Sequence, residues 1–94
     1  MFYTNLSTVP FGKDLRKLDL KGADLRGAFL IAANLKSMNL TGADFIGADL
    51  RDADFSGADI SRSIFLTQSQ INSAKGDKNT KLPLNITKPM HWLR

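Results

Sequence analysis

The sequence contains no cysteine and no glutamate, and it has a single histidine, His91. The absence of cysteine excludes disulfides and thiolate metal sites. One histidine with no recognisably spaced partner leaves no nucleophilic or metal-binding constellation. The longest apolar run, Ala28 to Ala33, is far shorter than the roughly 20 residues of a membrane-spanning helix. We therefore expect no catalytic residue, no metal site and no cofactor.

The start of the chain also lacks a basic stretch followed by an apolar one, so we expect no secretion signal and predict a cytoplasmic protein. The length of 94 residues suits one domain. Residues 1–74 are balanced, with eight basic and eight acidic side chains, and the formal net charge of +4 arises from the tail. A basic tail can bind nucleic acid or acidic lipid, or it can simply keep the terminus solvated.

A five-residue repeat occupies residues 13–65. A large apolar residue recurs every fifth position, alanine commonly stands two positions before it, and Asp or Asn commonly lies between them. The large positions that we expect in the core are Leu15, Leu20, Leu25, Leu30, Leu35, Leu40, Phe45, Leu50, Phe55 and Ile60, with Phe65 as the next member. The alanines that we expect beside them are Ala23, Ala28, Ala33, Ala43, Ala48, Ala53 and Ala58.

A period of five fits neither regular structure. On an α-helix, residues five apart differ by about 140° beyond a full turn, so the large residues would spiral around the rod. On a flat strand, odd spacing places successive large residues on opposite faces. A short extended segment followed by a bend in each unit keeps both columns inside. Four such units would close a coil of about 20 residues, and coils would stack at roughly 4.8 Å.

The units Ala23-Asp24-Leu25-Arg26-Gly27 and Ala43-Asp44-Phe45-Ile46-Gly47 are typical of the repeat. They resemble the pentapeptide-repeat family, whose consensus is Ala-(Asp/Asn)-Leu-x-x, and the resemblance covers residues 13–65. It implies an all-β fold, a right-handed quadrilateral parallel β-helix, here of about two to three coils. Residues 67–77 and 79–83 and the ending His91-Trp92 also look like a tail found in some bacterial members, which implies a final capping turn.

A solenoid must cover its open ends, so we predict an N-terminal cap over 1–12, the β-helix over 13–66, and a C-terminal cap and basic tail over 67–94. After Ile60 the phase changes, because Leu66 and Ile71 are one residue out of step. Either a one-residue bulge carries the coil onward, or a short helical turn over residues 68–74 closes it. The later apolar residues are expected along the outside of the rod: Leu82, Leu84, Ile86 and Trp92.

The outward positions are mostly polar, and the repeat's aspartates are expected to hydrogen-bond at the bends rather than to catalyse. One unit departs from this pattern, because Phe29 and Ile31 point outward, and Ile46 is a second outward apolar position on the adjacent side. Exposed apolar patches commonly mark contacts. The candidate interface is therefore Phe29, Ile31, Ile46 and Trp92. The alternative is that the chain's own tail, through Trp92 or Ile86, covers Phe29 and Ile31.

These patterns predict a non-catalytic protein-interaction or scaffold module, not an enzyme, with no small-molecule substrate. Its protein partner is open, and a homodimer is one option. The resemblance suggests an alternative, since some family members mimic duplex DNA and inhibit topoisomerases. Such mimicry needs a long acidic rod, whereas this one is short and neutral. A third reading is that the basic tail binds nucleic acid or an acidic membrane.

Overall fold

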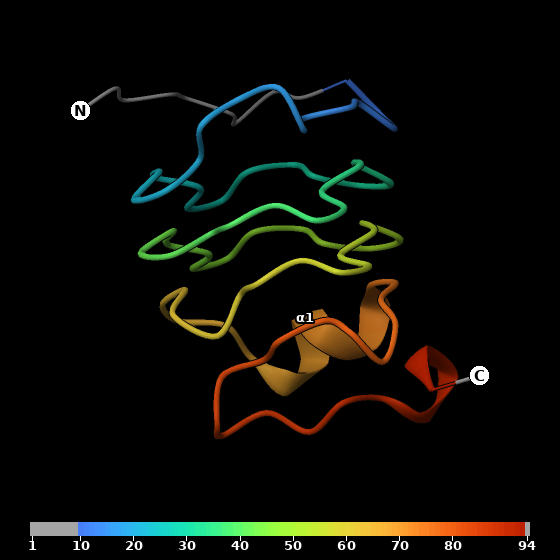
Figure 1. The fold of residues 1–94 in the computed structure, drawn as a ribbon. Coiled ribbons are helices and arrows are strands. Elements are labelled where there is room, and N and C mark those ends of the chain that lie inside the picture. The colour runs from blue at the N-terminus through green and yellow to red at the C-terminus, as the bar shows by residue number, and fades with distance from the viewer. Residues whose placement is uncertain (1–9, 94) are drawn as a thin grey trace.

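The computed structural model describes residues 10–93 and arranges them as a stack of coils (Figure 1). Parallel bridges join residues twenty apart, so four five-residue units complete one coil, as the repeat predicts. The bridges with this spacing are Asp14 to Asn34, Asp24 to Asp44, Phe29 to Asp49, Asn34 to Asp54, Asn39 to Asp59 and Asp44 to Ile64. The side chains at equivalent positions of successive coils therefore stack in columns.

Each bridge is a single residue pair, and residues 10–93 contain no continuous strand. A turn occupies two of every five residues, so only one residue on each side can pair before the chain bends. Two short helices lie near the C-terminal end: α1, Gln68–Ser73, and the 3-10 helix η1, Met90–Trp92. The predicted all-β class is therefore met only in the parallel pairing of the coils.

The bends are β-turns closed by a hydrogen bond over three residues. The N–H of Ala28 donates to the carbonyl of Leu25, and the N–H of Ala48 donates to that of Phe45. In most of these turns the third residue has a positive φ, for example 67° at Gly27, as a type II turn requires. Glycine is common there because it lacks the Cβ that makes this conformation unfavourable, although Ala32 adopts it with a φ of 57°.

The interior of the stack contains both predicted columns. The ten large residues from Leu15 to Ile60 are almost fully buried, and so are all seven alanines of the second column. The rings of Phe45 and Phe55 meet edge to face at 6.2 Å between centroids, a favourable aromatic geometry. Phe65 departs from its column, being 62% exposed, and Leu66 is buried in its place. The phase change seen in the sequence thus coincides with the end of the regular core.

The coil continues beyond Phe65 with a longer period. Asp54 pairs with Lys75 and Asp59 with Lys81, so the spacing grows from 20 to 21 and then 22 residues. The helical turn that the sequence offered forms as α1, but it does not close the coil; the coil continues with one extra residue, as the first option predicted. The extra residues are taken up by α1 and by the turn at Lys78 and Asn79.

The tail after this coil crosses the end of the stack (Figure 1). Ile86 and Trp92 are buried, Leu82 packs partly buried against the core, and Leu84 is fully exposed. The expectation that all four lie along the outside of the rod is therefore wrong for Ile86 and Trp92. Their apolar surface covers core that would otherwise face water at the end of the stack.

The predicted N-terminal cap, residues 1–12, lies mostly outside the described residues, and its three described residues, 10–12, are exposed. The predicted boundaries at 12 and 66 stay predictions. Within residues 10–93, neither helix has the length and apolar character that crossing a bilayer requires.

Candidate interaction surface

The repeat's aspartates serve the turns. In each case one carboxylate oxygen accepts a hydrogen bond from the N–H two residues later, at 2.9–3.2 Å, the geometry of an Asx turn. The aspartates that do so are Asp14, Asp19, Asp24, Asp44, Asp49, Asp54 and Asp59. Asn34 and Asn39 accept the same bond. These side chains therefore fold the bends, which explains why short polar residues recur at this position.

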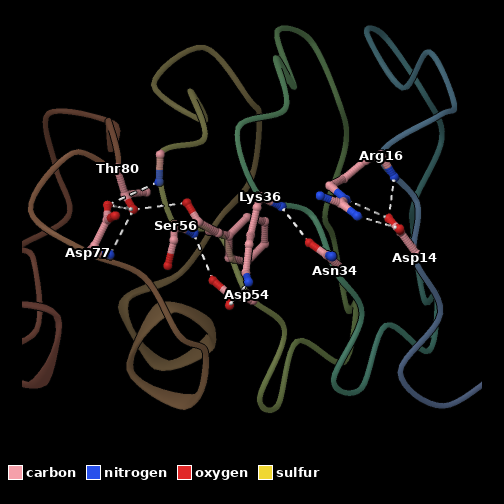
Figure 2. A network of polar contacts seen from close by, with 10 residues as sticks. Asp14, Arg16, Asn34, Lys36, Asp54, Ser56, Asp77 and Thr80 are labelled. Carbon is pink, nitrogen blue, oxygen red and sulfur yellow. Dashed lines mark hydrogen bonds and ion pairs between the residues drawn. The ribbon is translucent and has the colours of Figure 1, made fainter.

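Figure 2 shows one outward column, formed by Asp14, Asn34 and Asp54, with Asp77 of the last coil close to it. The side chain of Arg16 donates two hydrogen bonds to the carboxylate of Asp14, at 2.9 and 2.8 Å. Further along the stack, Asp77 accepts from the N–H of Gly57, at 3.0 Å, in the preceding coil. The column is therefore a chain of satisfied polar groups, not an open cluster of carboxylates.

The pKa values of several carboxyls lie below their ordinary range. Hydrogen bonds from the Arg51 side chain lower the pKa of Asp49. Hydrogen bonds from Ser61 lower the pKa of Asp59, and the N–H of Gly57 is the main cause of the lowered pKa of Asp77. A carboxylate with a lowered pKa is a poor proton donor at neutral pH. Within residues 10–93, no three His or Asp side chains gather in a way that could hold a metal ion.

The outward apolar residues lie on two consecutive sides of the coil. On one of these sides, Phe29 is 56% exposed and Ile31 is partly buried. Ile46, which is 46% exposed, lies at the corner between the two sides. Ile64 and Phe65 are also exposed, and the bridge from Asp44 to Ile64 places Ile64 on the side that precedes the corner at Ile46. We call Phe29, Ile31, Ile46, Ile64 and Phe65 the apolar face.

Trp92 does not belong to this face. Its side chain is 1% exposed, and its indole N–H donates to the carbonyl of Ala74 at 3.0 Å. The ring lies so close to Gly76 that a Cβ built there would approach it to 2.5 Å. Trp92 therefore caps the core. The described tail also leaves Phe29 exposed, so covering by Trp92 or Ile86 is not what the structure shows.

The sequence pattern did not identify two other sets of residues. Ile64 and Phe65 had a visible signal, since Ile64 stands where Asp or Asn is usual and Phe65 is the last member of its column. Gln70 had none. Its side-chain amide donates to the carbonyls of Phe45 and Ala48, at 2.8 and 3.1 Å, and so ties α1 to the preceding coil.

Part of the chain is similar to known proteins. The family model "Pentapeptide repeats" matches residues 30–65 with eight copies of the repeat. A curated protein of Bacillus subtilis (strain 168), "Uncharacterized protein YybG", is 67% identical over 30 residues. The matched stretch is 32% of this chain and only 11% of that protein, so this relative is much longer than the region shared with it.

Proposed function

We propose that this pentapeptide-repeat protein is a non-catalytic interaction module that associates through its apolar face, with a second copy of the chain as the partner. The architecture we propose for it is a right-handed quadrilateral parallel β-helix. Parallel bridges twenty residues apart, with a turn after every unit, support this geometry. The repeat family itself points to a non-catalytic repeat module.

The observation that carries the proposal is Phe29. It occupies the position at which seven aspartates accept the turn hydrogen bond, and a phenyl ring cannot accept it. The exposed ring also places apolar surface in water, at about 25 cal/mol per Å². Ile64 has the same two disadvantages. Phe29 and Ile64 both give up a local hydrogen bond and expose apolar surface, and exposed apolar patches commonly mark contacts with another chain.

Light scattering after size separation tests the proposal. The wild-type chain should elute as a dimer of the 10.4 kDa chain, and Phe29→Asp, which restores the repeat's usual residue, should elute as a monomer with an unchanged circular dichroism spectrum. Leu84→Asp is the matched control, because Leu84 is exposed but lies outside the apolar face, and it should stay dimeric. A wild-type chain that is monomeric at high concentration would overturn the proposal.

The other two functions have weaker support. The longest dimension of the described structure is 34 Å, and its carboxylates are largely engaged with turn N–H groups and arginines, which does not favour mimicry of duplex DNA. Binding through the basic tail predicts an affinity that falls steeply with salt and is lost when residues 75–94 are deleted. Lys88 already donates to the carbonyl of Lys78 and so is held within the tail.

A further inference from the structure

At the corner formed by residues 16–21 and 36–39, the first coil and the second coil are separated by a cleft. The residues around this corner line a cleft of about 420 Å³, within the range of small-ligand pockets. One wall is formed by the first coil, from Arg16 to Lys21, and the other by the second coil, from Lys36 to Asn39. The cleft lies half a coil, or ten residues, away from the corner of the apolar face at Arg26 and Gly27.

The cleft interrupts the backbone ladder. At the two neighbouring corners, the N–H of Gly12 donates to the carbonyl of Ile31 at 3.0 Å, and that of Gly22 donates to the carbonyl of Thr41 at 2.8 Å. Among the described residues, the matching bonds from Lys17 to Lys36 and from Leu20 to Asn39 do not form. Asn39 bridges Asp59 in the following coil but nothing in the preceding one. Backbone donors and acceptors on both walls thus have no main-chain partner among the described residues.

The cause is a residue that is too large. Leu18 stands in the alanine column, where most units of the repeat bury a methyl group, and its side chain is 43% exposed. It lies one coil before Met38, a large residue that is itself buried at the equivalent position, and we infer that this limits the room for Leu18 inside. Overfilling a packed position forces the backbone to shift. Lys17 also lacks the positive φ of the regular turns, so its N–H does not point along the stack as Gly22's does.

The lining is basic. Arg16, Lys21 and Lys36 line the cleft together with one carboxylate, Asp19, and Arg16 is paired with Asp14 at 2.8 Å. Lys36 lies 3.7 Å from Asp54, at partial solvent exposure. Within residues 10–93, the ammonium group of Lys21 forms no ion pair. The cleft therefore combines unpaired main-chain groups with excess positive charge.

We propose that this cleft binds a short extended acidic peptide from a partner protein. The peptide main chain pairs with the N–H and C=O of Asn39 and the carbonyl of Lys36, as in strand addition to a sheet edge. Its carboxylates form charge-assisted hydrogen bonds with Lys21 and Lys36. This site is distinct from the apolar face, so the two proposals stand or fall separately.

Fluorescence anisotropy with a labelled peptide of alternating Asp and Val tests the cleft. The wild-type chain should bind it and should not bind the same peptide with Lys in place of Asp. Lys21→Glu should weaken binding at least tenfold. Lys81→Glu, the same charge change on the last coil, should leave binding unchanged. Equal weakening by both variants would show only general attraction between charges and would overturn the proposal.

Leu18→Ala separates geometry from charge. It restores the alanine of the repeat without altering any charge, so the ladder should close, the thermal unfolding midpoint should rise, and peptide binding should fall at least tenfold. Unchanged binding, or a lowered unfolding midpoint, would contradict the cleft as described. Absence of peptide binding by the wild-type chain would overturn the proposal directly.

Discussion

The regular coils of residues 23–64 and the C-terminal segment of residues 65–93 bury the same kind of core by different means. In the regular coils, backbone groups bond to the next coil at fixed intervals, as from Leu30 to Asp49 and from Leu35 to Asp54. In the C-terminal segment the interval changes, and side chains take over part of this role. Thr80, for example, donates its hydroxyl to the carbonyl of Phe55 at 2.9 Å.

Gln68 illustrates this substitution. Its amide nitrogen donates to the carbonyl of Thr87 and its amide oxygen accepts from the N–H of the same residue, at 2.7 and 2.8 Å. A side-chain amide carries the same donor and acceptor as a peptide group, so it can replace one rung of a ladder. The comparison shows that side-chain hydrogen bonds can replace the backbone hydrogen bonds between coils where the 20-residue spacing changes.

The largest effect should come from Trp92, whose buried ring covers the core at the C-terminal end of the stack. Trp92→Ala removes a buried ring and the hydrogen bond to Ala74, and should lower the free energy of unfolding by about 3–5 kcal/mol. Leu35→Ala in the regular coils should cost about 2–5 kcal/mol. Urea denaturation measures both. A loss below 1 kcal/mol for Trp92→Ala would show that the end of the stack needs no cap.

The next effect isolates the contact between Gly76 and Trp92. Gly76→Ala should cost about 1–3 kcal/mol, because its methyl group would meet the indole ring. The structure gives Gly76 no positive φ, so this cost is one of packing and not of backbone conformation. In a Trp92→Ala background the same change should therefore cost almost nothing, which a double-mutant cycle measures. An equal cost in both backgrounds would contradict the contact.

Gln70 tests the link between α1 and the regular coils. Gln70→Ala removes two hydrogen bonds to Phe45 and Ala48 and breaks the capping box with Thr67, so it should cost about 1–2 kcal/mol. Ser69→Ala, an exposed change on the same helix, should stay within about 0.5 kcal/mol. Similar unfolding midpoints for the two variants would mean that α1 is not held by Gln70.

A smaller gain is expected inside the regular coils. Ala32 has a φ of 57°, a conformation that costs a residue with a Cβ about 1–2 kcal/mol, so Ala32→Gly should stabilise the chain by about 0.5–1 kcal/mol. Ala33→Gly is the control, since Ala33 is buried without a positive φ, and it should destabilise. Thermal unfolding of the two variants should shift in opposite directions, and shifts of the same sign would contradict the turn geometry.

Acid should have the mildest effect on the fold. The carboxyls of Asp49, Asp59 and Asp77 have pKa values below the ordinary 3.8 in the folded chain. Their contribution to stability is therefore complete above about pH 4 and is lost as the pH falls through their lowered values. Urea midpoints measured from pH 6 down to pH 2 should stay level and then decrease below about pH 4. A midpoint that rises on acidification would contradict the sign.

The parts of the molecule that repeat could be predicted from the sequence, because the same position recurs in many five-residue units. One exception, such as Met38 in the alanine column, does not hide the pattern. Single contacts have no such support. The sequence does not show to which carbonyls the side chains of Gln70 and Trp92 donate, because that depends on how α1 and the tail cross the last coil. Ile46 and Phe29 were identified as outward for the converse reason, since they break a pattern that is otherwise uniform.

Leu18 lies between these cases. Its departure from alanine is visible in the sequence, but a leucine in that column could have been buried by a wider coil. Only the structure shows that the side chain turns partly outward and that the ladder opens beside it.

The central claim is that the backbone bends once in each unit, so that residues twenty apart face each other in adjacent coils. The chain has no cysteine, so a pair can be introduced without interference. Asn39→Cys with Asp59→Cys joins two bridged residues, and stacked strands bring Cα atoms within the 4.4–6.8 Å that a disulfide needs. Asn39→Cys with Asp54→Cys, fifteen residues apart, places the thiols on different sides. Mild oxidation should form an intramolecular disulfide in the first variant and not in the second, and equal oxidation of the two would contradict the coil.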